Sequence, residues 1–237
     1  MKQFITMLFL LVSANSFAQK GFTISGDVSK VKDLIAKVYL NYYADGKSTM
    51  DSAEVKEGKF SFTGTLADPV MGSLRAKYQE VPGAKSMKAI SYNRDIKQVF
   101  LENSKIKIAS VDSFANATIK GSKSHTAYVS WTDLTKEETA QSAALNKEYS
   151  EFYKKKDQAG MDKIDAAFDK LTEQKNIKNK QYLKDNASSP IAMFVLKQYA
   201  GYDINADDVE PMFLALPEQL RASPAGKDMT EKLETAK

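Results

Sequence analysis

The sequence contains no cysteine, and this absence removes several kinds of chemistry at once. A chain without cysteine forms no disulfide, attacks no substrate through a thiolate and builds no cysteine-ligated metal site. Arginine is also scarce, since it occurs only at Arg75, Arg94 and Arg221. Because arginine carries most bidentate recognition of phosphates and bases, nucleic acid is not an expected partner.

The motifs of common catalytic and metal sites are missing as well. There is no Gly-x-Ser-x-Gly, so the single histidine, His125, is interpreted as a polar residue in the first turn of a helix. Residues 203–208 resemble the start of a calcium loop, but Asp208 and Leu214 stand where that loop needs glycine and glutamate. We therefore expect a chain that is not an enzyme, with no catalytic residue, no metal ligand and no cofactor.

Charge and composition indicate a folded chain without a surface that binds polyanions. Hydrophobic residues make up 43%, which is enough for a core, and 34 Lys and Arg face 30 Asp and Glu. The lysine-rich residues 154–156 and 175–180 have acidic residues nearby, so we interpret them as solvated helix faces.

The chain begins with a predicted export signal. Lys2 is followed by an apolar run over residues 4–12 and by small residues that end at Ala18. The run is far shorter than the ~20 residues of a spanning helix, so we expect a signal peptide over residues 1–18, cleaved after Ala18. The mature chain is expected to be periplasmic or otherwise exported, without stable membrane insertion.

Hydrophobic periodicity changes near Gly121 and divides the mature chain into two domains. Before Gly121 apolar residues alternate, and Asp45-Gly46 and Glu57-Gly58 are typical hairpin turns, the second joining residues 52–56 to residues 59–63. Phe60 and Phe62 are expected on one buried face. An antiparallel β-sandwich or barrel is therefore predicted over residues 19–121. Its strands are expected at residues 22–26, 37–43, 52–56, 59–63, 74–78, 97–101, 105–109 and 117–120.

After Gly121 the apolar residues recur at helical spacing, which predicts a helical domain over residues 122–237 and an α+β fold class overall. A first helix is expected from about residue 122 to residue 156, with a break at residues 158–160. Later helices are expected to begin at Ser189, Asp207 and Ser223. Four aromatic residues of the first helix are expected in the core, with an apolar groove as the alternative: Trp131, Tyr149, Phe152 and Tyr153.

Taken together, the order and spacing of six segments resemble a known family. The segments are Phe22-Thr23-Ile24-Ser25-Gly26, Val38-Tyr39-Leu40, Asp51-Ser52-Ala53-Glu54-Val55, Glu57-Gly58-Lys59-Phe60-Ser61-Phe62-Thr63-Gly64, Phe100-Leu101-Glu102-Asn103 and Gly121-Ser122. They resemble the β-rich domain of unknown function 4369 of exported proteins from Bacteroidetes-type bacteria. In that family the domain commonly precedes a helical linker and a thioredoxin-like domain, and residues 188–192 here are similar to the linker.

The resemblance implies a connection with thiol-disulfide oxidoreductases, although no Cys-x-x-Cys is present to carry their chemistry. We expect an exported, non-catalytic binding or scaffold protein that resembles the accessory region of such an enzyme. A thioredoxin-like protein of the cell envelope is the candidate partner. One alternative is an N-terminal fragment of a thioredoxin-like thiol-disulfide oxidoreductase whose catalytic domain is missing. A dimer through the helical hairpin is a further hypothesis.

Four tyrosines of the β-rich part form the candidate surface for a ligand or partner. Tyr42, Tyr43, Tyr78 and Tyr92 could make an aromatic platform for a peptide or glycan, because tyrosine combines a packing ring with a hydrogen-bonding hydroxyl. Residues 80–94 are expected to form a long loop, where binding residues often lie. An unrecognised enzyme that uses carboxylates from this loop is the remaining alternative.

Overall fold

The computed structural model describes residues 21–79 and 92–237, so the predicted signal peptide and most of the predicted long loop lie outside the described residues. The described residues form eight strands: β1 (Phe22–Asp27), β2 (Ile35–Ala44), β3 (Lys47–Glu54), β4 (Lys59–Gly64), β5 (Val70–Tyr78), β6 (Ile96–Leu101), β7 (Lys105–Ala109) and β8 (Thr118–Lys120). The helices are α1 (Tyr92–Asp95), α2 (Lys123–Leu134), α3 (Lys136–Lys155), α4 (Gln158–Asp185), α5 (Ala192–Ala200), α6 (Ala206–Leu214), α7 (Glu218–Arg221) and α8 (Pro224–Thr235).

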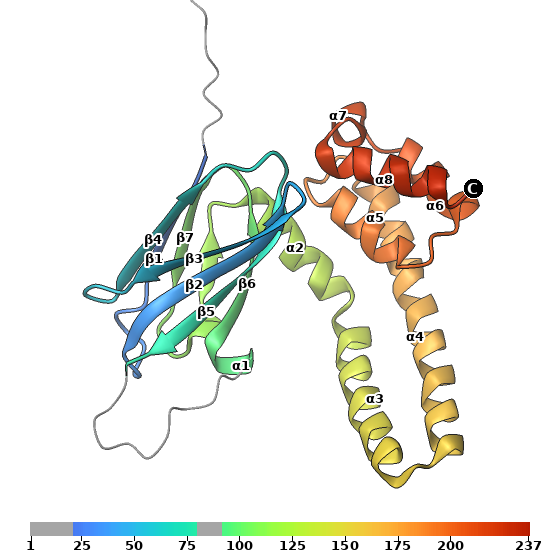
Figure 1. Ribbon diagram of the computed structural model, residues 1–237, viewed down its shortest axis with the longest axis horizontal. Coiled ribbons are helices and arrows are strands. Elements are labelled where there is room, and N and C mark those ends of the chain that lie inside the picture. Colours follow the sequence, from blue (N-terminus) through green and yellow to red (C-terminus); the bar gives the residue numbers. More distant parts are fainter. Residues whose placement is uncertain (1–20, 80–91) are drawn as a thin grey trace, which may run out of the picture.

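The strands form a sandwich of two four-stranded sheets, and the helices α2 to α8 follow it (Figure 1). One sheet has the order β4-β1-β7-β8 and the other has the order β3-β2-β5-β6. The predicted fold class is confirmed, and the sheets stay open instead of closing into a barrel. One pair departs from the expected antiparallel pattern, because β1 and β7 run parallel.

The two predicted turns form, but only one of them makes a hairpin. Asp45 and Gly46 have φ angles of 50° and 74° and join β2 to β3, which pair with each other. At the second turn Lys56 and Lys59 exchange two backbone hydrogen bonds of 3.0 and 2.9 Å. Beyond it the strands separate, since β3 pairs with β2 and β4 pairs with β1. The predicted pairing of residues 52–56 with residues 59–63 was therefore wrong.

The reason for this error lies in the side chains of the two strands. Phe60 and Phe62 of β4 are both buried, as predicted, and their ring centroids are 6.0 Å apart. In contrast, β3 has no fully buried residue. A two-residue turn fixes the local reversal of the chain, whereas the flanking side chains decide which sheet each strand joins.

The predicted first helix is two helices, α2 and α3, which meet at Thr135. The chain then reverses at Lys156, whose φ is 55°, and Asp157 caps α4 by accepting a hydrogen bond of 3.0 Å from the Gly160 amide. Gly160 was expected to break the helix and instead lies inside α4. A Cβ atom at Gly160 would lie 2.2 Å from the Phe152 ring, so the glycine allows the two helices to approach closely.

The starts of the later helices agree with the sequence in part. Ser223 caps α8 through a hydrogen bond of 3.2 Å from the Gly226 amide, as predicted. The cap of α6 is Asn205 instead of Asp207, with the Asn205 side chain accepting from the Asp208 amide. Helix α5 begins at Ala192, three residues after the predicted start at Ser189. None of the helices within the described ranges has the length and apolar character needed to cross a bilayer.

Phe100 on β6 joins the sandwich to the helices. Its neighbours Val99 and Leu101 point into the sandwich core, so the alternation of the strand turns Phe100 to the opposite face. There the ring is 1% exposed and belongs to the core of the helical region. It lies 5.3 Å from the ring of Phe194 and 5.8 Å from the ring of Tyr128.

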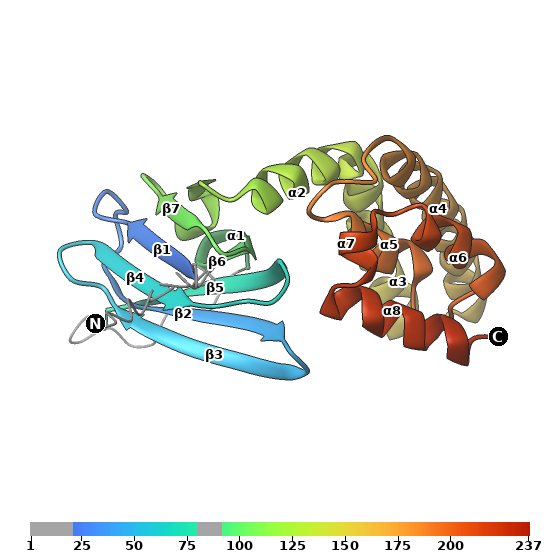
Figure 2. The ribbon, with the colours of Figure 1, turned by 90° about the horizontal axis from the view of Figure 1, so that it is seen from above.

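The backbone of the same residue is also paired with a helix. Because β6 is an edge strand, some of its peptide groups have no partner strand. The Phe100 carbonyl accepts a hydrogen bond of 3.0 Å from the Ser122 hydroxyl, and the Phe100 amide donates to His125 Nδ1 at 3.3 Å. The start of α2 thus pairs with this part of the open edge, and the rest of the helix runs from the sandwich toward the other helices (Figure 2).

Two carboxylates of the sandwich cap two helices of the helical region, α2 and α8. Glu102 accepts hydrogen bonds from the amides of Lys123 and Ser124 at the start of α2, at 2.5 and 3.1 Å. Asp68 accepts from the Ala225 amide at the start of α8, at 2.7 Å. Negative charge is favourable at a helix N-terminus, so both contacts stabilise the junction between sandwich and helices.

Replacing Phe100 with alanine should therefore uncouple the two parts. We expect Phe100→Ala to lower the free energy of unfolding of the helical region by about 3–5 kcal/mol, because a buried ring is lost and a cavity remains. The single tryptophan, Trp131, lies in this region, so urea unfolding followed by tryptophan fluorescence measures the effect.

Tyr43→Ala is the control, since Tyr43 lies on β2 of the same sheet and is 65% exposed. It should change the stability by less than about 0.5 kcal/mol. Equal losses in the two variants would contradict the role given to Phe100.

Candidate binding site

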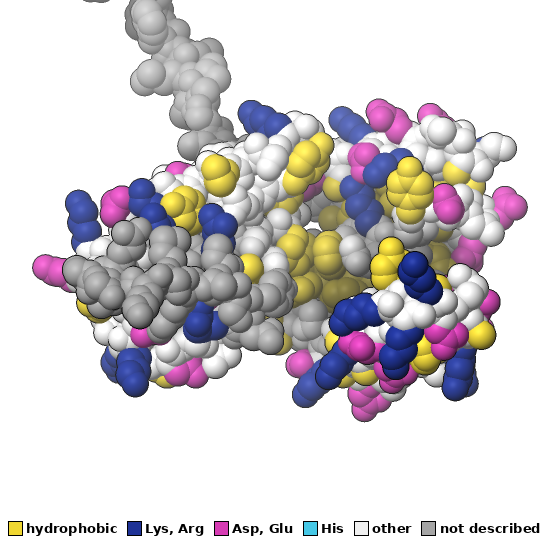
Figure 3. Space-filling model, turned by 60° about the horizontal axis from the view of Figure 1, so that its bottom comes forward, with side chains coloured by type: hydrophobic (Ala, Val, Ile, Leu, Met, Phe, Trp, Pro, Cys, Tyr) yellow, Lys and Arg dark blue, Asp and Glu magenta, His cyan; other side chains and the backbone are white. Residues whose placement is uncertain are grey.

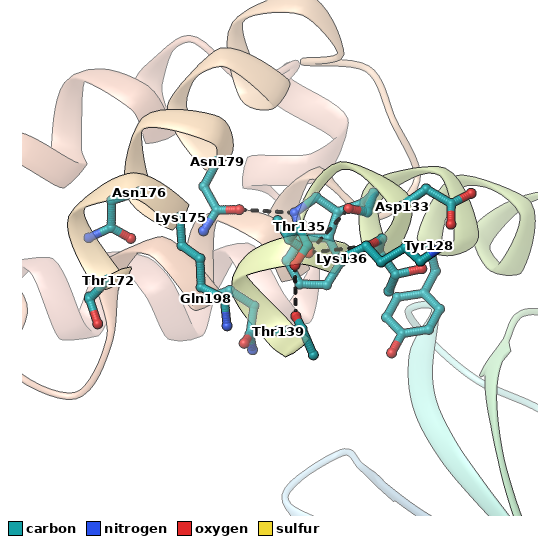
Figure 4. Close-up of a pocket in the computed structure, with 12 residues that line it drawn as sticks. Tyr128, Asp133, Thr135, Lys136, Thr139, Thr172, Lys175, Asn176, Asn179 and Gln198 are labelled. Carbon is teal, nitrogen blue, oxygen red and sulfur yellow. Dashed lines mark hydrogen bonds between the residues drawn. The ribbon is translucent and has the colours of Figure 1, made fainter. Parts of the chain in front are cut away.

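A groove of about 530 Å³ opens among four helices of the helical region (Figure 4). We call it the α4 groove, because α4 forms one of its walls while α2 and α3 form another and α5 contributes one residue. Its lining residues are Tyr128, Trp131, Thr132, Asp133, Thr135, Lys136, Thr139, Thr172, Lys175, Asn176, Asn179 and Gln198.

An aromatic pair from α2 forms one end of the groove. Tyr128 and Trp131 are three residues apart, so they lie on the same side of the helix, with ring centroids 6.0 Å apart. Trp131 Nε1 donates a hydrogen bond of 3.0 Å to Asn179 Oδ1, and the Phe194 ring packs edge-on against the indole at 5.5 Å. These contacts fix the orientation of the indole.

Hydroxyl and amide groups line the rest of the groove. The hydroxyls of Thr132 and Thr139 donate to carbonyls of their own helices at 2.8 Å, which leaves their oxygen lone pairs as acceptors. The side chains of Thr172, Asn176 and Gln198 make no hydrogen bond with residues 21–79 or 92–237. The groove therefore offers several donors and acceptors to an incoming molecule.

The charge of the groove is slightly positive, since Lys136 and Lys175 face a single carboxylate, Asp133. Glu138 lies nearby on α3 but is already paired, with Oε1 2.6 Å from Lys178 Nζ. This ion pair holds the pKa of Glu138 below its usual range despite burial. The second oxygen of Glu138 is buried without a hydrogen-bond partner in the described part of the chain.

His125 does not belong to the groove. It lies in the first turn of α2, as predicted, but it is buried at the junction, where Nδ1 accepts from the Phe100 amide. Burial, and then the charge of Lys97, lower the pKa of the imidazole to about 4. The ring is therefore neutral near pH 7 and acts as a structural acceptor. In the described ranges no group of three or more His, Asp and Glu could hold a metal ion.

The predicted tyrosine platform does not assemble from the three tyrosines whose side chains are described. Tyr42 points into the sandwich against Phe22, at 6.2 Å, whereas Tyr43 points to the opposite face. Tyr78 pairs with Ile35, at the other end of β2, roughly 23 Å along the strand from Tyr42.

Tyr78 and Tyr92, the last two tyrosines of the predicted platform, lie near the two ends of the predicted loop. Tyr78 is half-buried beneath the guanidinium of Arg94, and burial together with Asp95 raises the pKa of its hydroxyl to about 12. Tyr92 starts α1, and its side chain lies outside the described residues. Residues 92–95 thus form a short helix at the end of the predicted loop.

Sequence reasoning predicted Trp131 in the core, with an apolar groove as the alternative, and it missed the polar lining of the groove. Trp131 does pack against the helical core, but part of it lines the groove. A usable signal was present, since Thr132, Thr135 and Thr139 follow Trp131 at spacings that keep them near one side of a helix. Threonine is not a favoured residue for a helix interior, so a run of three next to a tryptophan favours a polar pocket. Tyr153, also predicted in the core, is 68% exposed at the far end of α3.

The sequence of the sandwich and of the first turns of α2 matches a known domain family. Residues 22–128 match the model of the family described as domain of unknown function (DUF4369), which is the family that the resemblance predicted. The match includes His125 and ends at Tyr128, and so it contains the contacts of α2 with Phe100. No curated protein matches the chain.

The low pKa of His125 predicts a specific loss of stability in weak acid. The unfolded imidazole binds a proton as the pH falls below 6.5, whereas the folded one stays neutral down to about pH 4. Stability is therefore complete above pH 6.5 and falls with decreasing pH. We expect a loss of about 1.4 kcal/mol between about pH 7.5 and pH 5.5, measured by urea unfolding.

His125→Asn is the matched variant, because the asparagine oxygen can accept from the Phe100 amide but does not titrate. It should show no such loss over the same interval. Carboxylates such as Glu138 change charge only below this interval, so they do not contribute to the difference between the two proteins. The same pH dependence in both proteins would contradict the assignment.

Proposed function

We propose that the chain is an exported, non-catalytic binding or scaffold protein that presents its helical region to a protein partner in the cell envelope. The observation that carries this proposal is a helical arm, made of α3 and the first half of α4, held by a fixed junction. Helix α3 packs against α4 and, at its start, against α2 (Figure 1).

The arm leaves apolar side chains accessible because two helices cannot enclose them. Leu145, Tyr149 and Phe152 of α3 are only half-buried, and Tyr153 is 68% exposed. Further hydrophobic side chains gather in a hollow between the sandwich and the helices (Figure 3). Exposed apolar surface of this kind is typical of sites that contact another protein.

Both ends of the arm are attached to the body of the protein. Helix α2 leads into α3 and is capped by Glu102 of the sandwich, while Tyr182 and Leu183 at the end of α4 are buried in the helical core. A partner bound at the arm would therefore be held at a set distance and orientation relative to the sandwich. This property supports a scaffold.

A thioredoxin-like protein is the partner we propose, on the basis of the DUF4369 resemblance. Because the sequence has no cysteine, any thiol chemistry in such a complex would belong to the partner. The proposal places the chain in the periplasm or outside the cell, after removal of residues 1–18.

Photo-crosslinking in intact cells tests the proposal. A photoreactive phenylalanine analogue in place of Tyr153 should give a discrete adduct with a thioredoxin-like protein, identified by mass spectrometry. The same analogue at Lys107 is the control, because Lys107 is an exposed residue of β7 in the sandwich.

Identical adducts from both positions, or no thioredoxin-like protein from position 153, would contradict the partner. An adduct of two copies of this chain from position 153 would replace the partner with the dimer.

A further inference from the structure

We propose that the α4 groove binds a small hydroxylated molecule with one acidic group, of the class of the acidic sugars. This inference rests on the groove alone and does not depend on the partner proposed for the arm. Its volume of about 530 Å³ is within the range of small-molecule sites in proteins.

The groove is formed before any ligand arrives, because hydrogen bonds fix its walls. Trp131 is bonded to Asn179 and so connects α2 to α4. Lys180 of α4 lies 2.8 Å from Asp208 of α6, and the Tyr199 hydroxyl of α5 donates to the same carboxylate. A preformed site loses little free energy to reorganisation when a ligand binds.

The aromatic end suits one face of a sugar ring. A pyranose presents C–H groups on its faces, and an indole or phenol ring held in place offers a flat apolar surface to them. Trp131 and Tyr128 are both half-buried, so part of each ring remains accessible in the groove. Phe194 and Asn179 restrict the indole and keep this surface in position.

The remaining lining suits the hydroxyl groups of a sugar. Each sugar hydroxyl donates one hydrogen bond and accepts others. The threonine oxygens offer acceptors, and the amides of Asn176 and Gln198 offer both donors and acceptors. An apolar ligand would bury these polar groups without partners, which is unfavourable. The lining therefore favours a ligand with several hydroxyls.

The charges select for an acidic group. Lys136 and Lys175 exceed Asp133 by one positive charge, and Glu138 is already neutralised by Lys178. A single carboxylate on the ligand would balance this excess through a charge-assisted hydrogen bond. Of the two lysines, Lys175 is the half-buried one, so it is the main candidate for this contact.

Fluorescence titration of the mature protein tests the proposal directly, because Trp131 is the only tryptophan in the chain. Glucuronate and galacturonate at up to millimolar concentration should change the emission of Trp131 and release or absorb heat in calorimetry. Glucose should bind at least about tenfold more weakly, and acetate should have no effect, because each lacks one of the two recognised features.

Two lysine variants of α4 provide the matched pair. Lys175→Gln should weaken binding of the acidic sugar about tenfold or more and leave weak binding of glucose unchanged. Lys163→Gln should bind as the unaltered protein does, since Lys163 is exposed and is not among the residues that line the groove. Circular dichroism checks that both variants are folded.

Three results would overturn the proposal. They are no fluorescence change and no heat with either acidic sugar, equal responses to acetate and to the sugars, and equal affinities in the two lysine variants. Crosslinking at position 153 is read out separately, so failure of the groove and failure of the partner are distinguishable.

Discussion

The structure depends on one short strand segment whose residues enter two cores. Phe100 lies on the edge strand β6, where its ring enters the helical core and its peptide group bonds Ser122 and His125 of α2. The neighbours of Phe100 on the strand complete the sandwich core. A β-strand places successive side chains on opposite faces, so one short segment contributes to both hydrophobic cores without a flexible linker. Tyr128 contacts Phe100 and also lines the α4 groove, so this contact helps to position one end of the groove.

How much the sequence predicts depends on the range of the interaction involved. Most strand positions, the capping of α8 by Ser223 and the burial of Phe60 and Phe62 come from local patterns, and these were predicted. The strand expected at residues 52–56 is instead β3, at Lys47–Glu54. The partner of β4 was mispredicted because its choice depends on contacts across the sandwich. The polar lining of the groove was missed for a similar reason, since it joins threonines of α2 and α3 to amides of α4 and α5.

The tyrosines give the clearest example of this limit. Composition shows that tyrosine is available on the β-rich part, but the pleat sends Tyr42 inward and Tyr43 outward, and strand length separates both from Tyr78. The residues that do share a surface are spaced along helices. Trp131 and Asn179 are distant in sequence and become neighbours only because the chain reverses at Lys156.

The parallel pairing of β1 with β7 has a consequence for the order of folding. Ile24 lies beside Ile106, although every strand of the other sheet falls between them in the sequence. The sheet β3-β2-β5-β6 can assemble from segments close in the chain, whereas the pairing of β1 with β7 needs strands from the two ends of the sandwich sequence. Closing so long a loop is slow. The strand β1 is thus completed in two stages, because β4 can pair with one of its edges early while its other edge stays open until β7 has been made.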